Sequence, residues 1–198
     1  YKIAAEMWHR EEYPDQLTEV LHVMIYKGKG SANNMDSAYR PIGLLNVATK
    51  IFTLCILSSL EPFIKAFIPE WQFGFQAGKN TEQAIAIFQW IRDIIVGSNK
   101  RAIALMFDYA DAFTSLSHRY MLYSLEAINV PHKLIRLIDK LYKRARAMVR
   151  TKGTKGEQII SPPYPINNGV IQGDGPSPKL FLVAMHQMIK QIHEAHPN

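Results

Sequence analysis

The chain has 198 residues, of which 47% are hydrophobic, and it carries a formal net charge of +6. This length and composition allow one packed domain or two closely packed subdomains, and they exclude a disordered or low-complexity chain. The basic charge favours a polyanionic partner such as nucleic acid, although many soluble proteins are equally basic.

Cysteine content and hydropathy set further limits. The single cysteine, Cys55, excludes a disulfide framework within the chain and a zinc cluster built from cysteines. It lies in an apolar run, so we expect a small core residue. We find no apolar stretch of membrane-spanning length and no signal peptide. We therefore expect an intracellular protein, with the choice between nucleus and organelle left open.

In chain order, the first predicted elements are a short helix over residues 3–10 and a strand over residues 17–26, where β-branched and apolar residues mix. Residues 27–36 are rich in Gly, Asn and Ser and predict a loop. Apolar residues at helical spacing over residues 43–66 predict a helix that Pro62 divides or kinks.

The middle of the chain predicts a loop, a helix and a strand. Residues 70–80 are interrupted by glycines and predict the loop. Residues 82–97 carry an apolar stripe at helical spacing and predict the helix. Residues 102–107 form a continuous apolar run that ends at Asp108, which is typical of a buried strand.

The last third predicts three helices and a hairpin. Two helices are expected over residues 119–128 and 131–145. The pattern that follows predicts a β-hairpin around residues 153–156, and the sequence after Pro178 predicts a helix to near the end of the chain. His186, His193 and His196 have no standard metal-ligand spacing, so we expect surface or tail residues.

Asp108 is the first candidate for chemistry. A carboxylate at the end of a buried strand is held rigidly at the sheet edge, and divalent cations prefer such oxygen ligands. The alternative is that Asp108 caps the following turn. Taken alone, the pair Asp108 and Asp111 is a weak signal, and the capping alternative is then the better interpretation.

Four longer motifs, one of which begins at Asp108, favour the metal-ligand interpretation of Asp108 over the capping one. They are YRPIGLLNVATKIF at 39–52, QFGFQAGKNTEQAI at 72–85, DYADAFTSLSH at 108–118 and GVIQGDGPSPKLF at 169–181. Together, in this order and spacing, they resemble the fingers and first palm motifs of a reverse transcriptase (RNA-directed DNA polymerase) domain of the non-LTR retrotransposon type. The ordered set covers most of the chain, and no single motif would be decisive.

The resemblance implies an α+β fold with right-hand polymerase fingers and a partial palm, in which helices pack on a small, mainly antiparallel sheet. It implies a fingers-like region over residues 1–101. Residues 102–198 would then form the partial palm, with inserted helices and the hairpin.

The same resemblance implies a set of site residues. Asp108 would be the catalytic carboxylate that binds Mg2+ or Mn2+, and basic fingers residues Lys27 and Arg40 would lie over the triphosphate of a dNTP. For Lys27 a solvated loop charge is an equal alternative, and Lys29 is a weaker candidate. The other nucleotide-binding candidates are Asp111, Ala112, Phe113, Gln172 and Gly173.

Phe113 matches a bulky ring below the sugar, which would collide with a 2′-hydroxyl and favour deoxynucleotides. The alternative is a core aromatic residue. The basic stretch between residues 133 and 155 is a second candidate surface, for the backbone of a template–primer duplex, and a solvated helix face is nearly as good an explanation. Its members that we single out are Lys143, Arg144, Arg146 and Arg150.

The chain departs from the family pattern at four places. The usual Asp, Arg, Ser and Pro-Leu are replaced by Thr114, Gln76, Gly43 and Gly175-Pro176. The aromatic-x-Asp-Asp motif is also absent, because these 198 residues contain no Asp-Asp pair. We therefore expect a portion truncated before that motif, which alone does not polymerise DNA.

Two functions remain open at this point. The first is RNA-templated DNA synthesis by the intact parent protein, with an RNA template, a DNA primer and dNTP as partners. The second is a domesticated, non-catalytic module that acts as a structural or nucleic-acid-binding subunit among protein and RNA subunits of a larger assembly.

Overall fold

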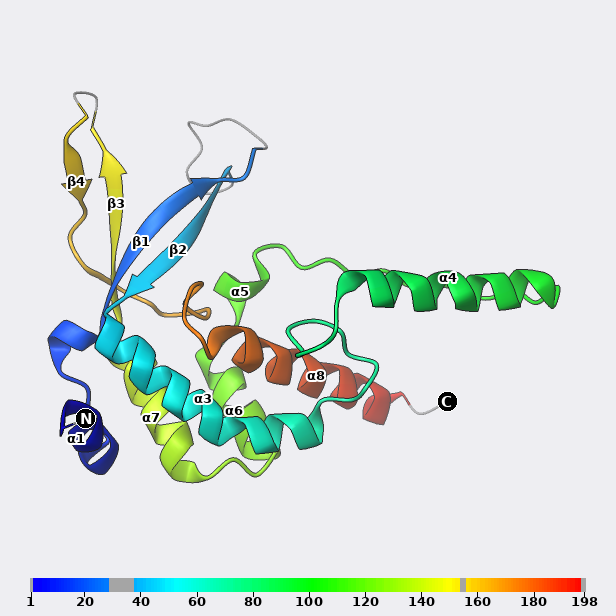
Figure 1. Ribbon diagram of the computed structural model, residues 1–198, viewed down its shortest axis with the longest axis horizontal. Helices are drawn as coiled ribbons and strands as arrows, with labels where there is room; N and C mark the ends of the chain where they lie inside the picture. The colour runs from blue at the N-terminus through cyan, green and yellow to red at the C-terminus, as the bar shows by residue number, and fades with distance from the viewer. Residues whose placement is uncertain (1, 29–37, 154–155, 197–198) are drawn as a thin grey trace.

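The computed structural model describes residues 2–28, 38–153 and 156–196. A packed body carries two β-hairpins that diverge toward their tips, and one long helix projects away from the body (Figure 1). The helices of the body are α1 (Lys2–Arg10), the one-turn η1 (Asp15–Leu17), α3 (Val47–Phe67), α5 (Ala112–Ser115), α6 (His118–Ala127), α7 (His132–Arg144) and α8 (Ser177–Ala195).

The sheet is mainly antiparallel. Its strands are β1 (Glu19–Tyr26), β2 (Tyr39–Leu45), β3 (Arg146–Lys152), β4 (Gln158–Ile160) and β5 (Tyr164–Pro165). The strand order is β2-β1-β3-β4, with β5 also paired to β3, and the β1–β3 pair is the parallel one. The expected α+β class, with helices packed on a small sheet, is confirmed. The division into two regions at residue 101 stays a prediction.

The core lies under the sheet, between α3, α6, α7 and α8. Phe52, Ile56, Leu60 and Ile64 follow one face of α3, and Leu137 and Val183 meet them from α7 and α8 in the same buried cluster. Burial of such side chains stabilises the fold by roughly 1.5–3 kcal/mol each. The predicted helices corresponding to α1, α6, α7 and α8, the strand β1 and the β3–β4 hairpin are confirmed.

The helix expected over residues 43–66 is wrong at its start. Residues Tyr39–Leu45 form β2, because each of them pairs with a residue of β1. The helix begins only at Val47, where the Asn46 side chain accepts a hydrogen bond from the Ala48 amide at 2.9 Å. It then continues through Pro62 to Phe67.

Two expectations about this part of the chain also need correction. Cys55 is exposed rather than a core residue, because it lies on the face of α3 that the core does not cover. By length and composition α3 could also cross a membrane, although 33% of its most apolar window is buried inside the protein. The same test is passed by core helices, and α3 supplies one side of this core.

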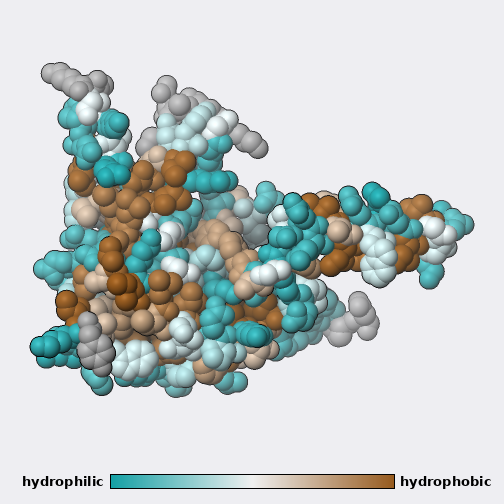
Figure 2. Space-filling model, viewed as in Figure 1, coloured by the Kyte–Doolittle hydropathy of each residue, from teal (hydrophilic) through white to brown (hydrophobic). Residues whose placement is uncertain are grey.

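Helix α4 (Thr81–Gly97) and the segment 98–110 form the projecting part, which we call the arm (Figure 1). A capping box fixes the start of α4, with Asn80 accepting from the Gln83 amide and Gln83 accepting from the Asn80 amide. No residue of α4 is buried. Figure 2 shows hydrophobic surface along α4 between its hydrophilic residues.

The buried strand expected over residues 102–107 is wrong. These residues are extended, fully on the surface, and none of the five strands pairs with them. Ile103 is 90% exposed and Phe107 is 80% exposed. A strand needs a neighbouring edge for its backbone groups, and the described residues offer none beside this segment.

Candidate functional site

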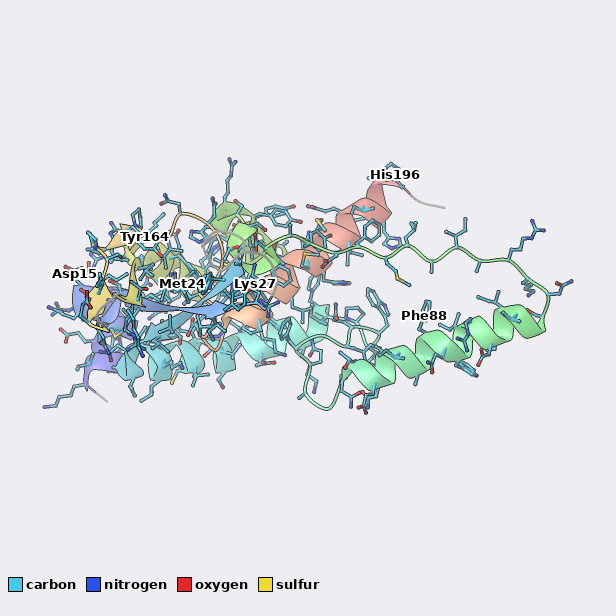
Figure 3. The ribbon with its side chains drawn as sticks, turned by 90° about the horizontal axis from the view of Figure 1, so that it is seen from above. Asp15, Met24, Lys27, Phe88, Tyr164 and His196 are labelled. Carbon is cyan, nitrogen blue, oxygen red and sulfur yellow. The ribbon has the colours of Figure 1, made fainter. Side chains whose placement is uncertain are left out.

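An open cleft of about 950 Å3 lies between the β1–β2 hairpin and the segment 108–114. The candidate catalytic residue and most of the candidate nucleotide-binding residues line it, although they come from four separate parts of the chain. They are Lys27, Arg40, Asp108, Asp111, Ala112, Phe113 and Gln172. Figure 3 shows Lys27 at the end of β1.

The β1–β2 pairing sets the positions of the two cations. Tyr26 pairs with Tyr39 in the ladder, and the Lys27 amide donates to the Ala38 carbonyl at 2.7 Å, so Lys27 follows directly beyond the last pair. Arg40 is exposed and, within the described residues, its side chain has no hydrogen-bond or ion-pair partner. Its guanidinium is therefore available to an anion in the cleft. Lys29 lies outside the described residues.

Lys27 and Asp111 form an ion pair across the cleft, with 3.4 Å between Nζ and Oδ1. The Asp111 side chain is 63% exposed, so the pair contributes little stability and can open to a competing anion. Asp111 itself turns the chain into α5, with a left-handed φ of 50°. Thr114 supports that turn by donating from its hydroxyl and its amide to the Asp111 carbonyl, both at 3.0 Å.

Phe113 is a half-buried ring held by two other rings. It stacks on Phe181 of α8, with 4.8 Å between centroids, and meets the edge of Phe75 at 5.8 Å. Packing of this kind restricts the ring to one orientation at the cleft wall. The two interpretations of Phe113, as a core aromatic and as a ring facing a ligand, are both compatible with this position.

Residues 169–175, the motif loop, are bonded to both walls of the cleft. The Val170 amide donates to the Phe113 carbonyl at 2.7 Å, and the Gln172 carbonyl accepts from the Gly43 amide at 2.6 Å. Gly169 has a φ of +83°, and a Cβ there would lie 2.6 Å from the Thr114 backbone. The motif loop therefore fixes the spacing between β2 and α5.

Gly173 does not line the cleft, unlike the other nucleotide-binding candidates. It has a φ of +112°, and a Cβ there would lie 2.5 Å from the Gly43 carbonyl oxygen. A Cβ at position 43 would likewise lie 2.7 Å from the Ile171 side chain. The glycine at 43, where the family usually has serine, is thus matched to a close approach of the motif loop.

Residues 27–197 match the protein family described as reverse transcriptase (RNA-dependent DNA polymerase). The chain belongs to the reverse transcriptase family. Among solved structures it is similar to an apo telomerase from Candida tropicalis truncated from its C-terminal domain, with a TM-score of 0.60 and 14% identity. The likeness covers 98% of this chain and 44% of that one, so it shows a shared fold over less than half of the telomerase chain.

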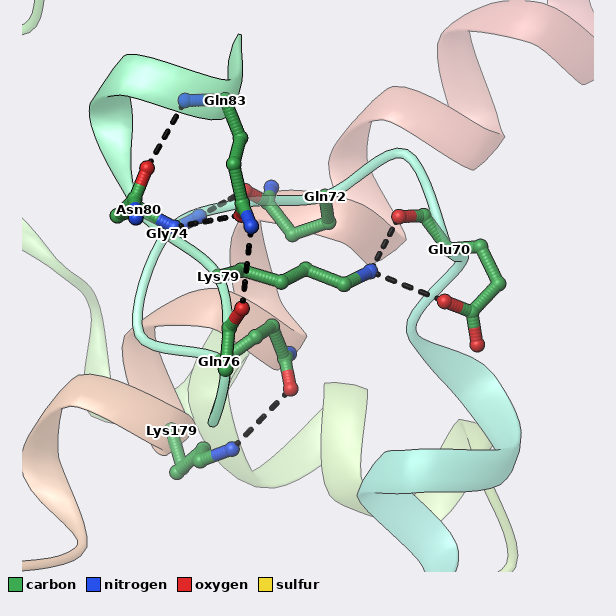
Figure 4. Close-up of polar contacts among 9 residues, drawn as sticks. Glu70, Gln72, Gly74, Gln76, Lys79, Asn80, Gln83 and Lys179 are labelled. Atoms are coloured by element: carbon green, nitrogen blue, oxygen red, sulfur yellow. Dashed lines mark hydrogen bonds and ion pairs between the residues drawn. The ribbon is translucent and has the colours of Figure 1, made fainter.

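A second departure from the reverse transcriptase motifs, Gln76, is explained by its neighbours (Figure 4). The Gln76 Oε1 atom accepts from Lys179 Nζ at 3.3 Å, and Lys179 also lies 3.6 Å from a Glu61 carboxylate oxygen. The usual arginine at this position would bring a second positive charge against Lys179. The adjoining loop is held by Lys79, which bonds the carbonyl and the carboxylate of Glu70.

Asp174 was given no role from the sequence, yet it is the buried carboxylate of the motif loop, with 4% exposure. Its Oδ1 accepts from the Thr53 hydroxyl at 2.8 Å and from the Gly175 amide at 3.0 Å. Burial raises the pKa of Asp174, and these hydrogen bonds partly oppose that rise. The Asp174 charge also adds to burial in raising the pKa of Tyr13, whose buried hydroxyl has no partner among the described residues.

The described residues do not by themselves build the metal site of a reverse transcriptase. Two carboxylates, Asp108 and Asp111, line the cleft, and Asp111 already faces Lys27. Within residues 2–28, 38–153 and 156–196, no group of three or more His, Cys, Asp or Glu side chains is placed to hold a metal ion. Asp108 can supply one hard oxygen ligand, and the remaining ligands would have to come from elsewhere.

His186 is not a surface or tail residue. Its ring is half-buried between Phe67 and Trp71, with centroid distances of 4.8 and 5.5 Å. Its buried Nδ1 has no hydrogen-bond partner within the described residues.

Three of the four basic candidates for a duplex surface have partners within the fold. Lys143 pairs with Asp139 at 2.6 Å, and Arg144 donates to the Tyr13 carbonyl at 2.7 Å. Arg146 donates to the carbonyls of Lys143 and Ala145. The side chain of Arg150, on β3, has no hydrogen-bond or ion-pair partner among the described residues.

Proposed function

We propose that this reverse transcriptase chain is the fingers and partial palm of an RNA-templated DNA polymerase of the non-LTR retrotransposon type, and that its cleft binds the incoming deoxynucleoside triphosphate. One observation carries the proposal. Residues of three separate motifs, at 39–52, 108–118 and 169–181, line a single cleft together with Lys27, which follows β1.

The cations suit the triphosphate. Arg40 is exposed and uncommitted, and its guanidinium fork can donate two parallel hydrogen bonds to phosphate oxygens. Lys27 can exchange the Asp111 carboxylate for a phosphate, because an ion pair with a largely exposed carboxylate is weak. The two side chains would thus hold the triphosphate against the fingers hairpin.

Phe113 suits the sugar. Its ring is fixed by Phe75 and Phe181, so it cannot easily turn aside to admit a 2′-hydroxyl. A rigid clash against the competing substrate is a common way to obtain specificity. Replacing Phe113 with Ala should therefore raise the use of ribonucleotides relative to deoxynucleotides, measured as the ratio of the two kcat/KM values in the complete polymerase.

Asp108 would supply one carboxylate to the divalent ions that bridge the primer 3′-hydroxyl and the triphosphate in the complete enzyme. Its exposed segment is free to join further strands that carry other carboxylates. The aromatic-x-Asp-Asp motif that the family uses for this purpose is not among these 198 residues.

Primer extension tests the proposal in a protein that contains this chain together with an aromatic-x-Asp-Asp palm segment and a thumb. Asp108→Ala should abolish extension on an RNA template, while Asp93→Ala, on exposed α4, should leave it unchanged. Unchanged extension by the Asp108 variant would remove that residue from the site.

A second function is favoured by the exposed arm and by the incomplete metal site of the described residues. In this alternative the chain is a domesticated, non-catalytic subunit of a larger protein and RNA assembly. It predicts a fixed partner that co-purifies with the chain, and an assembly that shows no primer extension. Extension by the purified assembly that depends on Asp108 would exclude it.

A further inference from the structure

A second hollow, of about 300 Å3, lies beside the cleft. Its walls come from β1, β5 and residues 166–172, with single residues of β2, α5 and the middle of β3. It shares Met24, Pro41, Thr114 and Gln172 with the cleft, so the two spaces are adjacent. Neither Lys27, Arg40 nor Asp108 lines it, so it is separate from the proposed triphosphate site.

Two rings form one side of this hollow. The Tyr164 hydroxyl and the His22 Nδ1 atom lie 2.9 Å apart and form a hydrogen bond, and the two ring planes meet at 61°. The β3–β5 pairing places Tyr164 opposite Ala147, while His22 pairs with Val149 across β1 and β3. Figure 3 shows Tyr164 near the sheet, on the same side as Met24 and away from the arm.

The lining has no formal charge under neutral conditions. None of the described residues around the hollow is Lys, Arg, Asp or Glu, and burial lowers the pKa of His22, which favours its neutral ring. A phosphate or a metal ion would therefore find no counter-charge here. The ligand that this lining suits is uncharged.

The lining also combines flat apolar surface with free amides. Val170 and Ile171 form a buried apolar base. Asn167, Asn168 and Gln172 line the same hollow, and their side-chain amides make no hydrogen bond within the described residues. Amide side chains pair with the edges of nucleobases, and aromatic rings stack on their faces. An aliphatic side chain of a protein partner would leave all three amides unused.

We propose that this hollow binds an unpaired nucleobase of single-stranded nucleic acid, turned out of its stack toward Tyr164 and His22. The inference rests on the proposed function, because it assumes that a nucleic-acid strand passes along the cleft. The base is not that of the incoming nucleotide, since the hollow contains none of the groups assigned to the triphosphate. It belongs to the nucleic-acid strand that passes along the cleft.

Abasic scanning of a bound strand tests the proposal with the 198-residue chain. The probe is an RNA–DNA duplex with a short single-stranded RNA extension, because the duplex end fixes the register. Removing the base at one position of the extension should weaken binding by roughly tenfold, as expected for the loss of one stacked base, and neighbouring positions should have little effect.

Variants of the ring wall show whether that effect arises in the hollow. Tyr164→Ala should weaken binding of the intact probe by a similar factor and remove the penalty of the abasic position. Tyr164→Phe keeps the ring and should retain binding. Tyr123→Ala, which removes an exposed tyrosine of α6, should behave like the unchanged protein. Circular dichroism and thermal unfolding confirm that each variant is folded.

Three results would overturn the proposal. If the probe binds but every abasic position has the same affinity, the hollow holds no base and the proposed function is unaffected. If Tyr164→Ala and the abasic position weaken binding additively, the base lies elsewhere. If the folded chain does not bind the probe at all, this inference and the nucleic-acid part of the proposed function both fail.

Discussion

Helices α3 and α4 have similar apolar content, but one face of α3 is buried in the core, whereas α4 is not buried. In α3 the residues Phe52, Ile56, Leu60 and Ile64 are at most 3% exposed, because α7 and α8 cover that face. In α4 the equivalent stripe stays open, and Phe88 remains 49% exposed. Periodicity therefore predicts which face of a helix needs a partner, but the partner itself must come from another part of the fold.

The same contrast separates β1 from residues 102–107. Both are runs of strand-forming residues, yet β1 pairs with β2 on one side and β3 on the other. Residues 102–107 have no neighbour among the described strands. The body is thus stabilised by contacts within the chain, while the arm presents apolar surface and an unpaired backbone, features typical of a protein–protein interface.

The largest expected effect comes from one substitution made in both regions. Leu60 in the body is 0% exposed, so Leu60→Ala should lower the free energy of unfolding by about 2–5 kcal/mol. Leu105 in the arm is 76% exposed, so Leu105→Ala should change it by less than about 0.5 kcal/mol. Urea denaturation measures both, and equal losses would show that the arm is packed as tightly as the body.

Glycine substitutions should differ in sign between the two regions. Gly169→Ala should destabilise the protein by more than about 1 kcal/mol, because its φ is +83° and its Cβ would contact the Thr114 backbone. Gly97 ends α4 in open space, so Gly97→Ala should be neutral or should stabilise by up to about 1 kcal/mol. Thermal unfolding compares them, and a stable Gly169→Ala protein would contradict the close approach of the motif loop to α5.

The buried carboxylate of the body predicts a pH dependence. Because the pKa of Asp174 is raised in the folded state, its contribution to stability is fully present below the unfolded pKa, near about pH 4, and is lost as the pH rises through the folded value. Asp174→Asn should therefore gain stability relative to the unchanged protein between pH 4 and pH 7. Denaturation at both pH values measures this, with Asp93→Asn in the arm as the matched control. A loss of stability of Asp174→Asn relative to the unchanged protein between pH 4 and pH 7 would contradict the burial of Asp174.

The smallest expected effect on stability is at the apolar face of the arm. Ile91 is 46% exposed, so Ile91→Lys should leave the free energy of unfolding almost unchanged. It should, however, weaken any association through that face, because it places a charge on an apolar surface. Sedimentation velocity of the two proteins at matched concentrations tests this, and a large loss of stability would show that Ile91 packs within the chain.

Local sequence patterns correctly predicted the helices and strands whose signal lies within their own segment. The amphipathic α7 and the hairpin β3–β4 are examples, since each carries its helical or turn signal in one continuous segment. The strand β2 was mistaken for the start of a helix, because its apolar spacing is ambiguous and its pairing with β1 depends on non-local hydrogen bonds. The strand predicted over residues 102–107 was wrong for the same reason, because a strand needs hydrogen bonds to a neighbouring strand.

The motif resemblance selected side chains that come together in the cleft, although composition and spacing alone could not have placed them there. The burial of Asp174 and the contact between His22 and Tyr164 were not predicted. The last of these joins residues 142 positions apart, and no local sequence signal reports such a contact. A short polar residue inside a glycine-rich motif loop, such as Asp174, is equally hard to assign before the fold is known.

The measurement that tests the account most directly is equilibrium binding of a dNTP to the 198-residue chain in the presence of Mg2+. Arg40→Ala, in the cleft, should weaken binding by roughly ten- to a hundredfold, because it removes charge-assisted hydrogen bonds to phosphate. Arg92→Ala, on the exposed arm, should bind like the unchanged protein. Equal affinities for the Arg40 and Arg92 variants, with both proteins folded, would contradict the assignment of the cleft as the nucleotide site.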